Sequence, residues 1–283
     1  MPAQMRAVLA GVVLLVLAAC GSPAEGPAAG PSAERSLILA TTTSTQDSGL
    51  LDELLPAFTE ATGWGVKPIA VGSGQAIEMG RRGEADVLLV HSPAAEEEFV
   101  AEGTAGRRLL VMHNDFVLLG AEADPAGVRG LAVDEAMRRI AASGAVFVSR
   151  GDESGTHARE KSLWEQAGVE PAGAGYQETG QGMGATLRVA AEKAGYTLAD
   201  RATYLSQPDG LAVLVEGDPG LLNVYHVIEV TTRAGDRVQP EAATAFADWI
   251  TGTDAQQRIG EFGRAEFGQP LFVPDAGKPD PTG

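Results

Sequence analysis

Polar residues and glycines at positions 149–156 could form a site for a negatively charged group. They read Ser-Arg-Gly-Asp-Glu-Ser-Gly-Thr, directly after the apolar residues 146–148 and before a helical pattern. The free N–H groups of a helix start and the hydroxyls of Ser154 and Thr156 would point donors at one spot. Arg150 adds a planar fork with two parallel donors. The segment predicts an oxyanion cradle, because the alternative, an ordinary helix N-cap, needs neither the arginine nor the two glycines.

A second cluster of hydroxyls lies near the start of the chain's folded part. Residues 41–45 read Thr-Thr-Thr-Ser-Thr between an apolar run and a helical pattern. They would sit at the carboxyl end of a strand, where open α/β sheets bind ligands. A polar loop with an ordinary cap is the alternative, and the matching donor cluster at 149–156 favours a binding role. Ser73, in Gly-Ser-Gly at 72–74, and the glycine-rich turn at 180–184 are further candidates, although such turns are commonest as turns alone.

Catalytic and metal-binding patterns are not found in the sequence. Residues 151–155 read Gly-Asp-Glu-Ser-Gly, which is not the nucleophile elbow of hydrolases. The 4 histidines lack metal-ligand spacing, and both the Walker A and the dinucleotide fingerprints are absent. We therefore expect no catalytic residue, no metal and no cofactor, and we interpret the histidines as surface or hydrogen-bonded structural residues.

The elements that must position these clusters alternate between short apolar runs and helical patterns. This rhythm predicts a parallel sheet with helices on both faces, arranged as two α/β lobes. Two apolar runs within 109–119 are split by polar residues. A helical pattern begins near Leu50, and Pro56 within it predicts a kink or an early end of that helix. The expected strands are 37–39, 66–71, 87–90, 146–148 and 221–230, and the expected helices are 76–82, 94–102, 134–142, 155–167, 184–194 and 241–262.

The net charge of −17 disfavours nucleic-acid binding, so any anion site must depend on local donors. At the N-terminus, Arg6 and the apolar run 7–17 fit a signal peptide, since the run is too short to span a bilayer. The one cysteine, Cys20, follows Leu-Ala-Ala, which resembles a bacterial lipoprotein box with a lipidated cysteine. A plain secretory signal with a chance cysteine is the alternative. We expect a signal peptide at 1–19 and a lipidated, flexible tether at 20–35.

The chain resembles the tungstate-binding proteins of bacterial tungstate ABC importers. The resemblance covers most of the body and rests on 41–44, 85–91, 114–117, 149–157, 180–184 and 196–201. It implies a type II periplasmic-binding-protein fold, in which two α/β lobes with a hinge close over a central anion cleft. We expect lobe one at 36–115 and 226–275, lobe two at 116–225 and a disordered tail at 276–283. The resemblance implies these ligand-binding residues: Thr42, Thr43, Ser44, Ser73, Arg150, Ser154, Gly155 and Thr156.

The function implied by the resemblance is capture of tungstate outside the cytoplasm by a membrane-anchored monomer that delivers it to an ABC permease. Phosphate-binding proteins share the pattern of 150–156 but carry a carboxylate after the strand that matches 87–90, and here His91 and Ser92 stand there. Such a carboxylate accepts the proton of phosphate and would repel fully deprotonated tungstate. Molybdate, sulfate or phosphate binding stays open. A secreted hydrolase or phosphatase using Ser154 is the alternative class, and it lacks an oriented base. We expect Asp47 and Asp152 to orient Arg150 or to cap helices.

Overall fold

The computed structural model describes residues 35–207 and 210–281, and the predicted signal peptide, Cys20 and most of the tether lie outside them. The strands are β1 (Ser36–Thr42), β2 (Gly65–Val71), β3 (Val87–Val90), β4 (Ala105–Gly120), β5 (Phe147–Ser149), β6 (Tyr176–Glu178), β7 (Thr197–Asp200), β8 (Ala212–Val215), β9 (Leu222–Val230) and β10 (Val273–Pro274). The helices are α1 (Thr43–Asp47), α2 (Leu50–Thr62), α3 (Ser73–Arg81), α4 (Pro93–Ala101), α5 (Val133–Ser143), α6 (Gly155–Gln166), α7 (Met183–Glu192), α8 (Arg201–Ser206), α9 (Pro240–Ile250), α10 (Thr253–Glu261) and α11 (Arg264–Phe267). Two 3₁₀ turns lie at Gly173–Gly175 and Pro219–Leu221.

The main sheet is mixed rather than parallel. Its order is β10-β4-β9-β3-β1-β2. Strand β1 pairs in parallel with β2 and β3, as the alternation of strands and helices predicts. The prediction of an all-parallel sheet is wrong for β9, which runs antiparallel to both β3 and β4. The reason is topological, because the chain leaves this half of the molecule along β4 and returns along β9.

Strand β4 is one continuous strand of 16 residues and includes both apolar runs and the polar residues 113–115 between them. Residues 105–115 pair with β9, and residues 116–120 pair with β7 and β8. His113, Asn114 and Asp115 are tolerated inside the strand because β9 pairs with the backbone on one side throughout this stretch. Strand β4 therefore carries the chain from one half of the molecule into the other.

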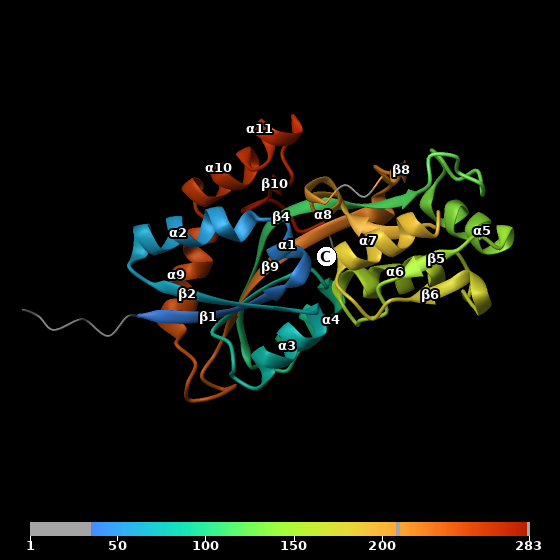
Figure 1. The fold of residues 1–283 in the computed structure, drawn as a ribbon. Coiled ribbons are helices and arrows are strands. Elements are labelled where there is room, and N and C mark those ends of the chain that lie inside the picture. The colour runs from blue at the N-terminus through green and yellow to red at the C-terminus, as the bar shows by residue number, and fades with distance from the viewer. Residues whose placement is uncertain (1–34, 208–209, 282–283) are drawn as a thin grey trace, which may run out of the picture. The chain divides into compact units, whose positions relative to one another are not determined.

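The apolar residues form separate clusters in the two halves. In the first half, Leu37 and Leu39 pack with α2 and α9, whereas Ala40 packs with α3 on the opposite face of the sheet. Figure 1 shows α2 and α3 on opposite sides of β1 and β2. In the second half, Phe116 packs with α5 and α6, whereas Val117 packs with α7. Side chains alternate between the faces of each strand, so both halves are α/β layers built on a sheet covered on both faces.

Two predicted helix boundaries need correction. The expected helix 241–262 is two helices, because the chain becomes extended at Gly252, with ψ of 164°, between α9 and α10. Gln256 donates through Nε2 to the carbonyl of Ile250 at 2.9 Å, which satisfies a free carbonyl at the end of α9. The predicted early end at Pro56 is wrong, because α2 continues to Thr62. Burial of Leu50, Leu54 and Phe58 on one face outweighs the hydrogen bond that Pro56 cannot make.

The C-terminal segment packs against the first half of the molecule as far as residue 280. Arg108 donates through Nη1 to Asp280 Oδ2 at 2.9 Å, and Asp280 Oδ2 also lies 2.9 Å from His226 Nε2. His226 and Glu96 are fully buried beside them, with His226 Nδ1 2.8 Å from Glu96 Oε2. The prediction of a disordered tail from residue 276 is therefore wrong for this part, because a buried charge cluster holds it.

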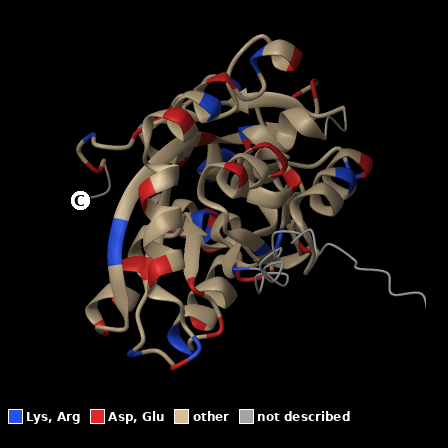
Figure 2. Cartoon of the chain, turned by 90° about the vertical axis from the view of Figure 1, so that its left-hand side faces the viewer, with Lys and Arg blue, Asp and Glu red and all other residues tan. Residues whose placement is uncertain are grey.

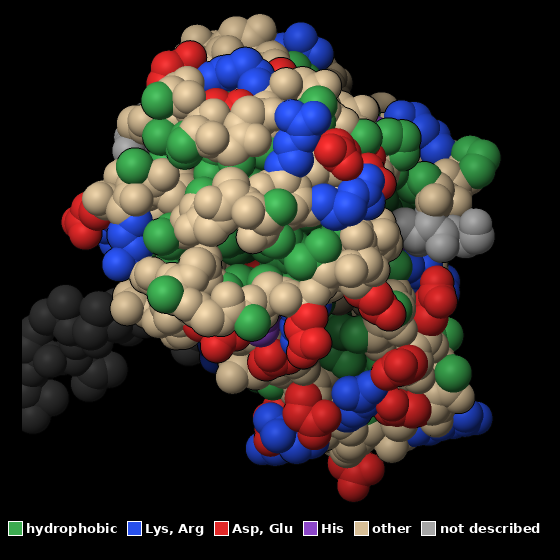
Figure 3. All heavy atoms as spheres, turned by 90° about the vertical axis from the view of Figure 1, so that its right-hand side faces the viewer, with side chains coloured by type: hydrophobic (Ala, Val, Ile, Leu, Met, Phe, Trp, Pro, Cys, Tyr) green, Lys and Arg blue, Asp and Glu red, His purple; other side chains and the backbone are tan. Residues whose placement is uncertain are grey.

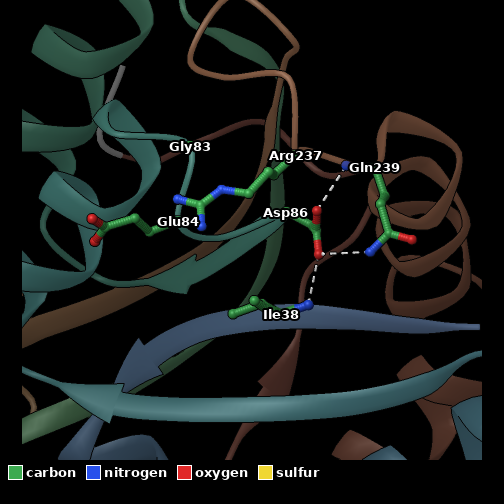
Figure 4. Close-up of a pocket in the computed structure, with 6 residues that line it drawn as sticks. All are labelled: Ile38, Gly83, Glu84, Asp86, Arg237 and Gln239. Atoms are coloured by element: carbon green, nitrogen blue, oxygen red, sulfur yellow. Dashed lines mark hydrogen bonds between the residues drawn. The ribbon is translucent and has the colours of Figure 1, made fainter.

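Asp86 clamps the start of β1 to the start of α9, away from the predicted ligand residues (Figure 4). It is only 3% exposed. Its Oδ2 accepts from the backbone N–H of Ile38 at 2.7 Å, and its Oδ1 accepts from that of Gln239 at 2.7 Å. Both carboxylate oxygens are therefore used as acceptors, which gives Asp86 a structural role.

Asp86→Asn is expected to lower the free energy of unfolding by about 2 kcal/mol, because an amide N–H₂ would face a backbone donor and leave it unpaired. Urea unfolding followed by circular dichroism measures this loss. Glu84→Gln, an exposed neighbour at the same pocket, serves as the control and should change stability little. Equal stabilities of Asp86→Asn and wild type would contradict the clamp.

Candidate oxyanion site

Arg150 joins the two predicted donor loops. It follows β5 and its side chain is 2% exposed. Its Nη2 donates to Thr43 Oγ1, in the threonine loop, at 3.1 Å. It also donates through Nε and Nη2 to Asp152 Oδ2, at 3.1 and 2.5 Å. Asp152 thus contacts Arg150, and its Oδ1 also accepts from the backbone N–H of Ser154 at 3.2 Å, so both expected roles, orienting Arg150 and capping a helix, agree with its contacts. The arrangement holds a buried guanidinium between Thr43 and Asp152, which are more than a hundred positions apart.

The start of α6 comes close to the first half of the molecule at Gly155. A Cβ placed on Gly155 would lie 2.7 Å from Ser73 Oγ and 2.9 Å from His91 Cε1. Only glycine fits this approach. Gly151 also requires glycine, because its φ is +60° and a Cβ there would lie 2.6 Å from Glu178 Cβ. Glycine is therefore required at both positions, at Gly155 by the neighbouring side chains and at Gly151 also by the positive φ.

Ser154 and Thr42 both cap helices. Ser154 Oγ accepts from the backbone N–H of His157 at 3.2 Å, and Thr42 Oγ1 accepts from that of Thr45 at 3.2 Å. Thr42 Oγ1 also lies 2.7 Å from Thr45 Oγ1 and 3.1 Å from Ser44 Oγ. Both loops therefore contain a helix N-cap, and capping does not exclude a second role in binding a ligand. Capping by Ser154 leaves its hydroxyl hydrogen available to a ligand.

Two buried hydroxyls where the two halves meet have no hydrogen-bond partner among the residues that the structure describes. They are Ser73 Oγ, at the start of α3, and Thr156 Oγ1, in the first turn of α6. Burying a polar atom unpaired costs on the order of 1–3 kcal/mol. Ser73 and Thr156 border Gly155, so a bound group with acceptor atoms would satisfy them both.

His91 lies beside this site, and the interpretation of the histidines as surface or hydrogen-bonded structural residues agrees, in its second alternative, with the contacts of His91. It follows β3, is 4% exposed, and its Nε2 lies 3.1 Å from Thr42 Oγ1 and 3.3 Å from Ser44 Oγ. Its Nδ1 lies 2.9 Å from Asn223 Oδ1. Burial, helped by the nearby charge of Arg150, lowers its pKa to about 4. In the sequence, the feature that indicates a place at the site is the position of His91 directly after β3, the strand that pairs with β1.

His91 makes folding sensitive to acid. Its folded pKa of about 4 lies below the ordinary 6.5, so the unfolded chain binds its proton first as the pH falls. Stability is therefore lost as the pH falls from 6.5 to 4, by up to about 3 kcal/mol, and is unaffected by this group above 6.5. The raised pKa of buried Asp200 acts in the opposite direction. We expect His91→Gln to flatten the wild-type acid slope in urea unfolding at stepped pH, and equal slopes would contradict this.

The remaining predicted residues are placed as follows. Thr42 and Ser44 contact His91, Thr43 contacts Arg150, and Ser73 faces Gly155, which precedes Thr156. Asp47 makes no hydrogen bond with Arg150 among the described residues; burial raises its pKa, while Arg150 acts to lower it. The glycine-rich turn at 180–184 contacts a different part of the molecule. Gly184, at the start of α7, lies against the side chain of Gln207, because a Cβ on Gly184 would be 2.2 Å from Gln207 Oε1.

A cleft of about 470 Å³ reaches this site between α4 and α6. Its lining includes His91 and Asn223 from one half and Gly155 from the other, so the cleft lies where the two halves meet. Figure 2 shows charged positions of both signs scattered over one side of the molecule, and Figure 3 shows acidic side chains intermixed with basic ones in the lower part of the opposite face. An anion must therefore be attracted by the buried donors and not by the surface charge.

Chemistry at Ser154 is not supported by its surroundings. Glu153 donates its backbone N–H to His157 Nδ1 at 3.1 Å, so that nitrogen is not a base for the Ser154 hydroxyl. Among residues 35–207 and 210–281, no group of three His, Cys, Asp or Glu side chains could hold a metal ion. Within the same ranges, no helix is long and apolar enough to cross a bilayer.

Two α/β halves connected by the long strands β4 and β9, with a donor-lined site where they meet, define a solute-binding protein of the type II periplasmic-binding-protein fold. The model of the PBP superfamily domain matches residues 22–254. The tungstate-binding protein TupA of Peptoclostridium acidaminophilum is 47% identical over 97% of this chain and 99% of its own. TupA of Campylobacter jejuni is 39% identical over 82% of this chain and 88% of its own.

Solved structures agree with these sequence matches. The tungstate-binding protein TupA of Desulfovibrio alaskensis G20 is 48% identical, with a TM-score of 0.74 over 86% of this chain and 99% of that chain. The tungstate ABC transporter protein of Geobacter sulfurreducens is 43% identical, with a TM-score of 0.74 over 82% and 100% of the two chains. The chain belongs to the PBP superfamily and, within it, to the TupA family of tungstate-binding proteins. This family consists of solute-binding transport proteins and not of enzymes.

Proposed function

We propose that this protein captures tungstate outside the cytoplasm and delivers it to the transmembrane subunits of an ABC permease. The observation that carries the proposal is the buried Arg150, which links the two donor loops beside the unpartnered hydroxyls of Ser73 and Thr156. A tetrahedral dianion offers acceptors to all of these groups and charge to the guanidinium. The relatives named above bind tungstate, which supports this cargo over sulfate and phosphate.

The proposed ligands are the residues that the sequence suggested, with one change of role. Thr43, Ser44, Ser73, Arg150, Ser154, Gly155 and Thr156 would contact the anion, Gly155 through its backbone N–H. Thr42 would act mainly by holding the loop, because its hydroxyl already contacts Thr45, Ser44 and His91. The two halves, with the boundaries expected from the sequence, would act as lobes that close over the anion by bending at β4 and β9.

Isothermal titration of the purified protein with tungstate, molybdate, sulfate and phosphate tests the proposed function. We expect binding of one tungstate per chain, much weaker binding of sulfate, and the weakest binding of phosphate. Molybdate has nearly the same size, shape and charge as tungstate and serves as the comparison within the class. No heat with tungstate, or tighter binding of phosphate, would overturn the proposal.

Attachment of the protein to the membrane through a lipid on Cys20 is part of the proposal. Cys20 lies outside the described residues, and its support is the short apolar run and small residues before it in the sequence. We expect Cys20→Ser to move the protein into the aqueous phase on detergent partitioning while tungstate binding in vitro stays unchanged. Ser22→Ala, which keeps the cysteine, is the matched control. Unchanged membrane retention of Cys20→Ser would refute the lipid anchor.

A further inference from the structure

One face of α6 lines the cleft between the two halves. Its cleft-lining residues are spaced three or four positions apart along the helix: Gly155, Ala158, Arg159 and Ser162. Residues with this spacing lie on the same side of a helix, so Arg159 stands one turn from Gly155, with roughly 5–6 Å between the positions of their Cβ atoms. The cleft wall therefore presents a guanidinium group next to the glycine of the oxyanion site.

Arg159 is the one cation among the described residues that line this cleft, and Glu97, on α4, is the one carboxylate. Within the described part of the chain, no hydrogen bond or ion pair joins Arg159 to a carboxylate. Its Nη2 donates to the carbonyl of Gly220, and its Nε is buried without a partner. The carboxylate of nearby Asp218 instead accepts the backbone N–H groups of Val133 and Gly220, at 3.0 and 2.8 Å.

The surroundings of Arg159 leave its charge available to a ligand. The side chain is partly buried, and this burial lowers the pKa of the guanidinium, while the charge of Asp218 acts to raise it. A buried N–H donor without an acceptor is costly, and an anion that reaches it from the cleft would remove that cost. The cleft, of about 470 Å³, has room for an oxyanion with part of its hydration shell, since one water takes about 30 Å³.

We propose that Arg159 forms an outer anion-binding position, at which an incoming oxyanion binds before it passes to Arg150. The inference rests on the proposed function and adds the route by which the ligand enters. A protein with a net charge of −17 repels a dianion at long range, and Glu97 adds to this repulsion at the cleft itself. A cation on the cleft wall offsets the repulsion on the path to the buried donors.

The rate constants of tungstate binding test the inference. Radioactively labelled tungstate is mixed with the protein, bound anion is separated by rapid filtration, and dissociation is started with excess unlabelled tungstate. At about 10 mM salt, we expect Arg159→Gln to lower the association rate constant at least about threefold without raising the dissociation rate constant. At about 1 M salt, where the Debye length is about 3 Å, the difference should shrink to less than about twofold. Loss of a residue of the inner site, such as Arg150, should instead speed dissociation.

Matched variants separate the position of the charge from the net charge. Arg139→Gln, on the exposed face of α5, changes the net charge by the same amount as Arg159→Gln and should bind and release tungstate as the wild type does. Glu97→Gln removes the carboxylate of the cleft and should raise the association rate constant at least about twofold at low salt. Glu98→Gln, its exposed neighbour on α4, does not line the cleft and should leave the rate unchanged.

The outcomes distinguish this inference from the proposed function. If the wild type binds tungstate and Arg159→Gln associates with it at the wild-type rate, there is no outer position at Arg159. Equal slowing by Arg139→Gln, or faster dissociation from Arg159→Gln, also overturns the inference. Should Arg159→Gln fail to fold, equal association rates of Glu97→Gln and Glu98→Gln contradict the cleft as the route. Absence of tungstate binding by the wild type overturns the proposed function, and this inference with it.

Discussion

Arg150→Ala is expected to weaken tungstate binding by roughly 30-fold to several thousand-fold, the loss that follows from removing one partner of a buried, charged contact. Arg150 is 2% exposed and is the cation that reaches both donor loops, through Thr43 and Asp152. Without it, much of the charge of a bound dianion is left to neutral hydroxyls and N–H groups. Asp152, only 18% exposed, also loses the cation that balances it and then repels the ligand.

Arg150→Lys should recover only part of the affinity, because an ammonium cannot contact Thr43, Asp152 and an anion with a planar fork. Arg139→Ala, on the exposed face of α5, is the matched control and should bind as the wild type does. Titration calorimetry of the three variants measures the effect. Binding by Arg150→Ala within about threefold of wild type, a difference of ~0.7 kcal/mol, would show that the hydroxyl loops hold the anion alone.

Gly155→Ala is expected to weaken tungstate binding by about 5-fold to 150-fold, the equivalent of about 1–3 kcal/mol of overpacking. The added Cβ would lie 2.7 Å from Ser73 Oγ and 2.9 Å from His91 Cε1. His91 cannot move aside without losing its bond to Asn223, so the start of α6 must retreat from the first half. The expected result is therefore incomplete closure over the anion.

Small-angle scattering with and without tungstate gives a second measure of closure for Gly155→Ala. Compaction on adding tungstate should be smaller than in the wild type. Gly65→Ala is the matched control, since a Cβ there lies no closer than 3.6 Å to its neighbours. Wild-type affinity together with wild-type compaction in Gly155→Ala would mean that this approach does not govern closure.

The local turns that carry the site could be predicted from the sequence. Ser154 and Thr42 cap helices within three residues, and such caps depend on neighbours along the chain. Arg150 and the glycines beside it stood out for the same reason, since residue type and spacing alone made them unlike an ordinary cap. The sequence therefore predicts the same kind of donor loop at the start of α6 and at the threonine loop, and it does not predict that the two are close together.

What only the tertiary structure decided is how these loops meet. His91 is 132 positions from Asn223 in the chain, and its neutral, oriented state depends on burial and on that one carbonyl oxygen. The antiparallel course of β9 and the continuity of β4 depend on pairing between distant strands, which local apolar patterns do not encode. Residue types along the chain thus determined which groups could hold an oxyanion. Packing of the two halves determined which of those groups lie together, because only long-range contacts bring Arg150 to Thr43 and Gly155 to Ser73.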